Sequence, residues 1–241
     1  MGILGQYPRE TVIQKLEGEV ATWNAADPST PVIPAIQYIA VTAQGSPQPD
    51  GTYRLHMPAD QIDKALSMAD EVHGVLILDV QVGLSSLQAE LPRLAPYLSK
   101  PNVELAVDPE FDMYGGHKPG TVIGTMSSSE INYAINFLDQ IVTQNNLPPK
   151  FLVVHRFTQA MVTGSRNIAP TANVQVIMDM DGWGSPAKKL GTYTNIVAPE
   201  PVQFTGFKLF YKNDLRPPST RMLTPAELLK LHPAPIYIQY Q

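Results

Sequence analysis

Three apolar runs of the chain end in the same pattern, an acidic residue, one further residue and a second polar residue. The three endings are Asp79-Val-Gln81, Asp108-Pro-Glu110 and Asp179-Met-Asp181. Successive side chains of a strand point to opposite faces, so residues two apart share a face. Each pair is therefore predicted to project from one side of its strand at the carboxyl end, where parallel α/β barrels build their active sites.

Asp108 and Glu110 form the sharpest of these patterns. Two neighbouring carboxyl groups do not ionise independently, because a single proton on the pair relieves their repulsion and raises one apparent pKa. A carboxylic acid that stays protonated near neutral pH can protonate the leaving-group oxygen of a glycoside. The alternative interpretation is a pair of solvated loop carboxylates.

Further acids follow the neighbouring runs. Asp79 is expected to orient Asp108 or tune its charge, and Asp181 to act as a partner base or to bind sugar hydroxyls. Asp179 is expected to lie among the same surrounding acids. Trp183 either stacks on the apolar face of a sugar or packs within its own loop. The predicted catalytic residues are Glu110, Asp108, Asp181 and Asp79.

His155, near the end of the fifth run, has three interpretations: a proton relay, a metal ligand or a hydrogen-bonded core histidine. No second histidine stands at a metal-ligand spacing, so we predict no metal and no cofactor. His155 is assigned to substrate binding with polar residues at other strand ends. The predicted binding set is Gln6, Tyr38, Gln81, His155, Asp179, Trp183, Tyr211, Lys212 and Gln239, with Tyr7, Gln37, Asp214 and Gln241 as weaker candidates.

The composition narrows the classes of function. The 241-residue chain has no cysteine, and it contains no GxSxG elbow, P-loop or HExxH motif. A formal charge of −5 without a Lys/Arg block argues against nucleic acid, and no apolar run approaches the roughly 18 residues of a membrane helix. We expect a carbohydrate-binding monomer, extracellular or in the cell envelope after loss of an export signal, with the cytoplasm as an alternative.

Eight apolar runs read as parallel strands covered on both faces. They are Gly2–Gln6, Ile33–Val41, Val75–Val82, Val103–Phe111, Phe151–Phe157, Val174–Asp181, Gly206–Tyr211 and Ile236–Tyr240. Helical periodicity appears between most of them, at 9–25, 61–72, 86–98, 130–144 and 226–231, with weaker helices at 159–162 and 185–190. The alternation predicts one (β/α)8 TIM barrel domain over residues 1–241 that lacks its eighth helix; a doubly wound sheet is the alternative.

Asp108-Pro-Glu110 at the end of the fourth predicted strand resembles the D-x-E arrangement of family-18 chitinases and family-25 lysozymes. The resemblance implies that Glu110 is the general acid and Asp108 its assistant. The wider chitinase signature has a further Asp two residues upstream, where this chain has Ala106. Longer phrases resemble a group of uncharacterised bacterial exported proteins and lipoproteins of barrel type, which implies a carbohydrate-facing setting. These phrases are ILDVQVG, ELAVDPEFDM, FLVVHRFT, VIMDMDGWGSP and FKLFYKND.

Three functional hypotheses follow from the sequence. The first is a glycoside hydrolase that cleaves a polysaccharide or cell-wall glycan, with Glu110 as its acid. The second is a glycan-binding barrel without catalysis. The third is a metal-assisted hydrolase that uses the same acids together with His155.

Overall fold

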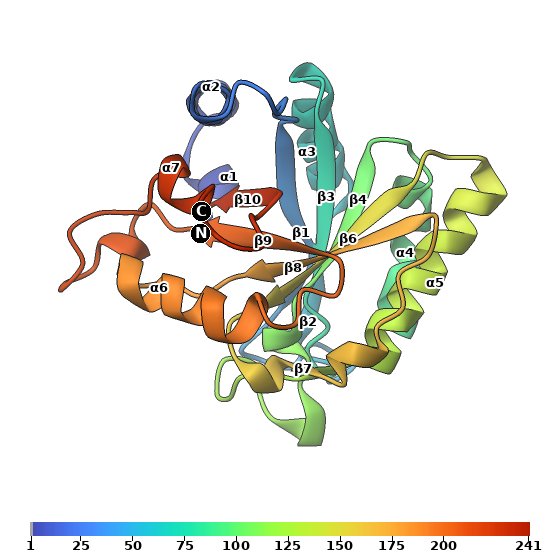
Figure 1. The fold of residues 1–241 in the computed structure, drawn as a ribbon. Coiled ribbons are helices and arrows are strands. Elements are labelled where there is room, and N and C mark those ends of the chain that lie inside the picture. Colours follow the sequence, from blue (N-terminus) through green and yellow to red (C-terminus); the bar gives the residue numbers. More distant parts are fainter. Residues whose placement is uncertain (1) are drawn as a thin grey trace.

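The computed structural model describes residues 2–241, which form an α/β fold around one curled sheet (Figure 1). The strands are β1 (Ala35–Ala43), β2 (Arg54–His56), β3 (Val75–Val80), β4 (Val103–Val107), β5 (Met126–Ser127), β6 (Lys150–Arg156), β7 (Val162–Thr163), β8 (Val174–Met180), β9 (Phe204–Leu209) and β10 (Tyr237–Tyr240). The helices are α1 (Ile3–Gln6), α2 (Arg9–Ala26), α3 (Ala59–Glu71), α4 (Leu87–Leu98), α5 (Ser128–Asn145), α6 (Pro186–Thr192) and α7 (Pro225–Leu228).

The main sheet has the strand order β10-β9-β8-β6-β4-β3-β1-β2. Each strand from β1 to β10 along this order is parallel to its neighbours, whereas the edge strand β2 runs antiparallel to the end of β1. Strands β5 and β7 form a separate two-stranded sheet. The chain thus winds around the sheet in one direction, as in a barrel.

The prediction of a closed (β/α)8 barrel is wrong. Among the described residues, no backbone ladder joins β10 to β1, so the sheet is an open, curled half-barrel. The segment predicted as the first strand, residues 2–6, is the short helix α1, where Ile3 and Leu4 pack on the core. A short apolar run fits a strand or a helix equally well by periodicity alone, which is why the sequence misplaced it.

The opening between β1 and β10 is hereafter called the seam. Helices α1 and α2 lie over it, and the two ends of the chain meet beside β10 (Figure 1). Trp23 of α2 donates its indole N–H to the Tyr240 hydroxyl at 3.0 Å, and Tyr211 donates its hydroxyl to Glu19 at 2.6 Å. Helix α2 is therefore tied to the end of β10 but leaves the strand edges unpaired.

The sheet buries apolar side chains on both faces, as predicted for parallel strands. On its outer face the strands pack against helices such as α4 and α5, in the larger core. A capping box between Ser127 and Glu130 starts α5, and Asn146 ends it in the left-handed conformation. On the inner face a smaller cluster fills the curl of the sheet: Ile77, Ala106, Val153, Ile177 and Tyr237.

The polar pattern that follows the fourth predicted strand has a different local structure from the one expected. Strand β4 ends at Val107, and residues 109–111 form a 3₁₀ helix instead of continuing the strand. Pro109 has no N–H to donate, and the Asp108 side chain accepts the Glu110 N–H at 3.1 Å as the cap of this helix. Asp108 and Glu110 therefore do not share a strand face, although both reach the same cavity.

Candidate active site

The register of the strands places several inward-facing side chains in one layer above the inner apolar cluster. His155 on β6 is level with Asp179 on β8, which is level with Gly206 on β9. Gly206 is in turn level with Tyr237 on β10. Because side chains alternate along a strand, the next inward-facing position of β6, β8 and β3 after the apolar cluster carries a polar group. The polar layer therefore lies toward the carboxyl ends of the strands.

His155 is completely buried between two carboxylates. Its Nδ1 lies 3.0 Å from Asp179 Oδ2, and its Nε2 lies 3.5 Å from Asp79 Oδ2. The Gln37 amide, 3.0 Å from His155 Nε2, donates to the same Asp79 oxygen at 3.0 Å. Burial alone would lower the pKa of His155, but its hydrogen bonds to Asp179 and Asp79 raise it well above its ordinary value. His155 therefore acts as a buried cation that fixes these carboxylates, which matches the interpretation as a hydrogen-bonded core histidine.

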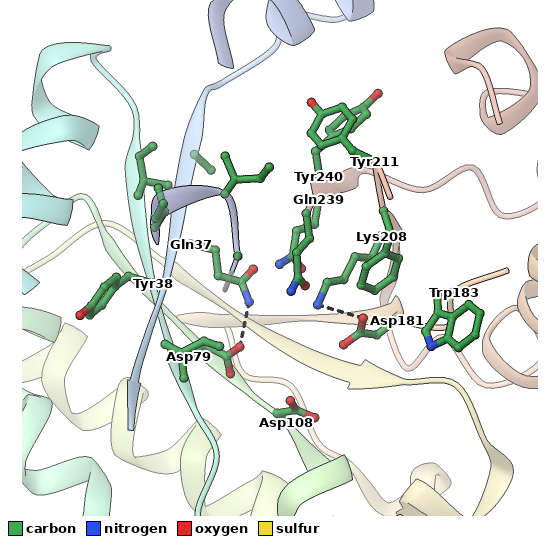
Figure 2. Close-up of a pocket in the computed structure, with 18 of the residues that line it drawn as sticks. Gln37, Tyr38, Asp79, Asp108, Asp181, Trp183, Lys208, Tyr211, Gln239 and Tyr240 are labelled. Atoms are coloured by element: carbon green, nitrogen blue, oxygen red, sulfur yellow. Dashed lines mark hydrogen bonds and ion pairs between the residues drawn. The ribbon is translucent and has the colours of Figure 1, made fainter. Parts of the chain in front are cut away.

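Lys208 of β9 is the second cation within the acidic cluster. Its Nζ lies 2.9 Å from Asp181 Oδ1, and Figure 2 shows its side chain reaching toward Asp181. Burial opposes the charge of Lys208, but the nearby carboxylates, Asp181 first, raise its pKa. Lys208 therefore stays protonated. The two cations His155 and Lys208 lie among five carboxyl groups, which are those of Asp79, Asp108, Glu110, Asp179 and Asp181.

Asp108 is held rigidly beside this cluster. Its Oδ2 accepts the Gln81 amide at 3.0 Å, and the carbonyl of that amide accepts the Ala43 N–H at 3.1 Å. Burial first, and then the negative charge of Asp79, raise the pKa of Asp108 to about 7. A large fraction of Asp108 is therefore protonated near neutral pH.

Glu110 has a different environment from the other acids. It is half-buried, it lines the cavity, and its carboxyl group makes no hydrogen bond or ion pair with any residue from 2 to 241. Burial first, and then the charge of Asp181, raise the pKa of Glu110 above its ordinary value. The site thus contains an unengaged carboxyl group with a raised pKa near a carboxylate that is paired with a lysine.

These groups open into a cavity of about 1040 Å³. It extends from the acidic cluster into the seam, where α1, Lys15 and Glu19 of α2 and Gln241 line it. Its lining includes the amide of Gln239, which points toward the acidic cluster, and the ring of Tyr38, which points away from that cluster (Figure 2). Within residues 2–241, no three His, Asp or Glu side chains are grouped so that they could hold a metal ion.

The structure brings most of the predicted site residues to this cavity. Its lining includes Asp79, Asp108, Glu110 and Asp181 from the predicted catalytic set, and Tyr38, Gln81, Trp183, Tyr211 and Gln239 from the predicted binding set. His155 and Asp179 lie beneath the lining and are completely buried. Gln6 and Lys212 lie apart, in a smaller adjoining pocket of about 190 Å³, where Lys212 Nζ donates to Gln6 Oε1 at 2.9 Å.

Three important members of the site were absent from the predicted sets. Lys208 lies inside an apolar run. A single lysine in a strand that is expected to be buried is the sequence feature that could have indicated a role in the site. Tyr237 donates its hydroxyl to Gln37 Oε1 across the seam, so this pair links β10 to β1 through side chains. Gly206 gave no signal in the sequence, yet a Cβ at this position would lie 2.6 Å from Asp179 Oδ1.

No protein-family model, curated protein or solved structure matches this chain. No helix within residues 2–241 has both the length and the apolar character needed to cross a bilayer.

Proposed function

We propose that this protein is a glycoside hydrolase that cleaves a polysaccharide or cell-wall glycan. The observation that carries the proposal is the environment of Glu110, an unengaged carboxyl group in the cavity wall with a raised pKa. Glycosidases use two carboxyl groups, one protonated and one ionised, on either side of the scissile bond. Glu110 supplies the first, and Asp181, paired with Lys208 at 2.9 Å, supplies the second.

The chemistry divides between these two acids. Glu110 donates its proton to the glycosidic oxygen as the bond to the anomeric carbon breaks. The Asp181 carboxylate faces the positive charge that develops on the sugar ring. As general base it takes a proton from the water whose oxygen forms the new bond to the anomeric carbon. Asp108 positions the acid, because its carboxyl group caps the short helix that carries Glu110.

The cavity has the size and chemistry of a glycan site. Its volume, about 1040 Å³, is at the upper end of the range for small-molecule pockets, about 300–1,000 Å³. Amides such as Gln239 provide both donors and acceptors for hydroxyl groups, and the exposed ring of Trp183 provides apolar surface. Because the cavity continues into the seam, it has room for more than one sugar unit.

The proposal is tested by replacing Glu110 with glutamine, which keeps the shape of the side chain but removes its proton. A panel of polysaccharides is incubated with wild type, Glu110→Gln and the control Glu17→Gln, and new reducing ends are measured. Glu17 is an exposed acid of α2 outside the cavity. We expect Glu110→Gln to lose at least about 100-fold in turnover, the usual contribution of a general acid, with an unchanged thermal midpoint.

Two other outcomes are informative. Unchanged turnover in Glu110→Gln would remove Glu110 from the acid role. Glycan binding by wild type without any new reducing ends would support the non-catalytic glycan-binding function instead. Incubation with a chelator separates the metal-assisted alternative, because that reaction requires a bound ion.

A further inference from the structure

Trp183 lies at the rim of the cavity close to two cations. Its side chain is 44% exposed, and it lines the cavity that also holds Glu110 and Asp181. Lys188 Nζ lies 5.0 Å and the Arg216 guanidinium 5.1 Å from the centre of its ring. Neither cation forms a salt bridge within residues 2–241. An exposed ring thus has two positive charges close to it that lack an acidic partner among these residues.

The loop that carries this ring is fixed by a buried carboxylate. Asp214 is completely buried and accepts hydrogen bonds from the Gly184 N–H at 3.0 Å and from Lys189 Nζ at 2.6 Å. Gly184 has a φ of +147°, and a Cβ there would lie 2.7 Å from Lys188 Cδ. The backbone thus leaves space for the stem of Lys188 beside Trp183. Arg216 follows Asp214 by two residues, so the hydrogen bond between Asp214 and Gly184 joins the segment that carries Arg216 to the loop that carries Trp183.

The rim cations Lys188 and Arg216 carry the opposite charge to the acidic cluster. The carboxylates Asp79 and Asp181 line the cavity and would repel a negatively charged sugar. A guanidinium and an ammonium group close to an exposed aromatic ring provide charged hydrogen bonds for an anionic substituent, and the exposed part of the ring provides apolar surface for the sugar. A neutral glycan would gain nothing from these cations.

We propose that Trp183, Lys188 and Arg216 form a subsite for a negatively charged sugar residue, so that the substrate is an acidic glycan. This inference rests on the proposed glycoside hydrolase function. The shared chemistry is an anionic group on the sugar ring, which is a carboxylate in uronic acids and a sulfate in sulfated galactans.

The test measures binding to the Glu110→Gln variant, which leaves the ligand uncut. The probes are two matched pairs of polymers, methyl-esterified polygalacturonate with polygalacturonate and desulfated carrageenan with carrageenan. Binding is compared between Glu110→Gln alone, the same variant with Lys188→Gln and Arg216→Gln, and the same variant with Arg93→Gln and Lys230→Gln. This last pair removes one arginine and one lysine at exposed positions outside the cavity.

Removing the rim cations is expected to weaken binding of the acidic member of one pair by roughly five- to tenfold, the effect of two exposed charge contacts. Binding of the neutral member, and all binding by the control double variant, should change by less than about twofold in the same comparison. The loss should shrink as salt is added. Preference for polygalacturonate or for carrageenan distinguishes a carboxylate from a sulfate.

Equal weakening of neutral and acidic polymers, or no weakening at all, would overturn the anionic subsite while leaving the glycan-cleaving function intact. If neither wild type nor Glu110→Gln binds or cleaves any glycan of a broad panel, the proposed function itself fails, and the subsite fails with it.

Discussion

Lys208 Nζ, from β9, lies 2.9 Å from Oδ1 of Asp181, the residue that follows the neighbouring strand β8. This ion pair places a positive charge inside a cluster of acids, where it also lowers the pKa of Glu110 against the effects of burial and of Asp181. Lys208 therefore interacts with both proposed acids: it pairs with Asp181 and lowers the pKa of Glu110.

Replacing Lys208 with methionine should move the pH profile of glycan cleavage. The rate falls as pH rises through the pKa of Glu110, because the acid must be protonated to react. Without the charge of Lys208 that pKa is higher, so the alkaline limb of kcat/KM should move to higher pH. The maximal rate should fall as well, since Asp181 loses its partner. The variant Lys230→Met, at an exposed position, should leave the profile in place, and an unmoved limb in Lys208→Met would argue against coupling to Glu110.

Replacing His155 with glutamine should destabilise the fold by about 3–5 kcal/mol, the usual cost of removing one partner of a buried ion pair. The raised pKa of His155 also sets a sign for the pH dependence of the wild type. The stability due to this histidine is fully present below its unfolded pKa, about 6.5, and is lost as pH rises through the higher folded pKa. Denaturant unfolding from pH 6 to 10 measures this decline, which should be absent in His155→Gln.

Replacing Gly206 with alanine should destabilise the protein by about 1–3 kcal/mol, as for other overpacked sites. The added Cβ would lie 2.6 Å from Asp179 Oδ1 and 2.8 Å from the ring of Tyr237. The matched control is Gly18→Ala in α2, where a Cβ meets nothing within 4 Å. The control should be stabilised by about 0.5–1 kcal/mol, because alanine favours a helix over glycine. Similar thermal shifts in the two variants would contradict the close packing of the polar layer.

Replacing Asp214 with asparagine should cost about 3–5 kcal/mol and release the loop that carries Trp183, because buried Lys189 loses its only carboxylate partner among the described residues. Tryptophan fluorescence reports the release, and Trp183→Phe in the same background assigns the signal, since Trp23 is the second of two tryptophans. A spectrum identical to wild type in Asp214→Asn would show that the loop is held by other contacts.

The sequence predicted the local elements and much of the site because both depend on short-range patterns. Continuous apolar runs identified each parallel strand of the main sheet, and helical periodicity identified the helices from α2 to α5. The polar groups that end these runs reach one cavity, because parallel strands in sequential order present their carboxyl ends on the same side. Glu110 and Asp181 could therefore be named from the order of the residues alone.

Whether the sheet closes into a barrel could not be predicted from short-range patterns. Whether β10 meets β1 depends on how far the whole sheet curls, and on residues 2–6 forming a helix, which are long-range properties. The role of Lys208 and the need for glycine at 206 also depend on neighbours from other strands.

The sequence by itself determined which side chains can hold or release protons and which strands carry them. Only the tertiary structure decided which of them are buried, paired or unengaged, and so in which direction their pKa values shift, because a pKa depends on burial and on nearby charges that distant segments bring together. It buried His155 completely between two carboxylates, left Glu110 unengaged in the cavity, and opened that cavity into a seam that no local pattern encodes.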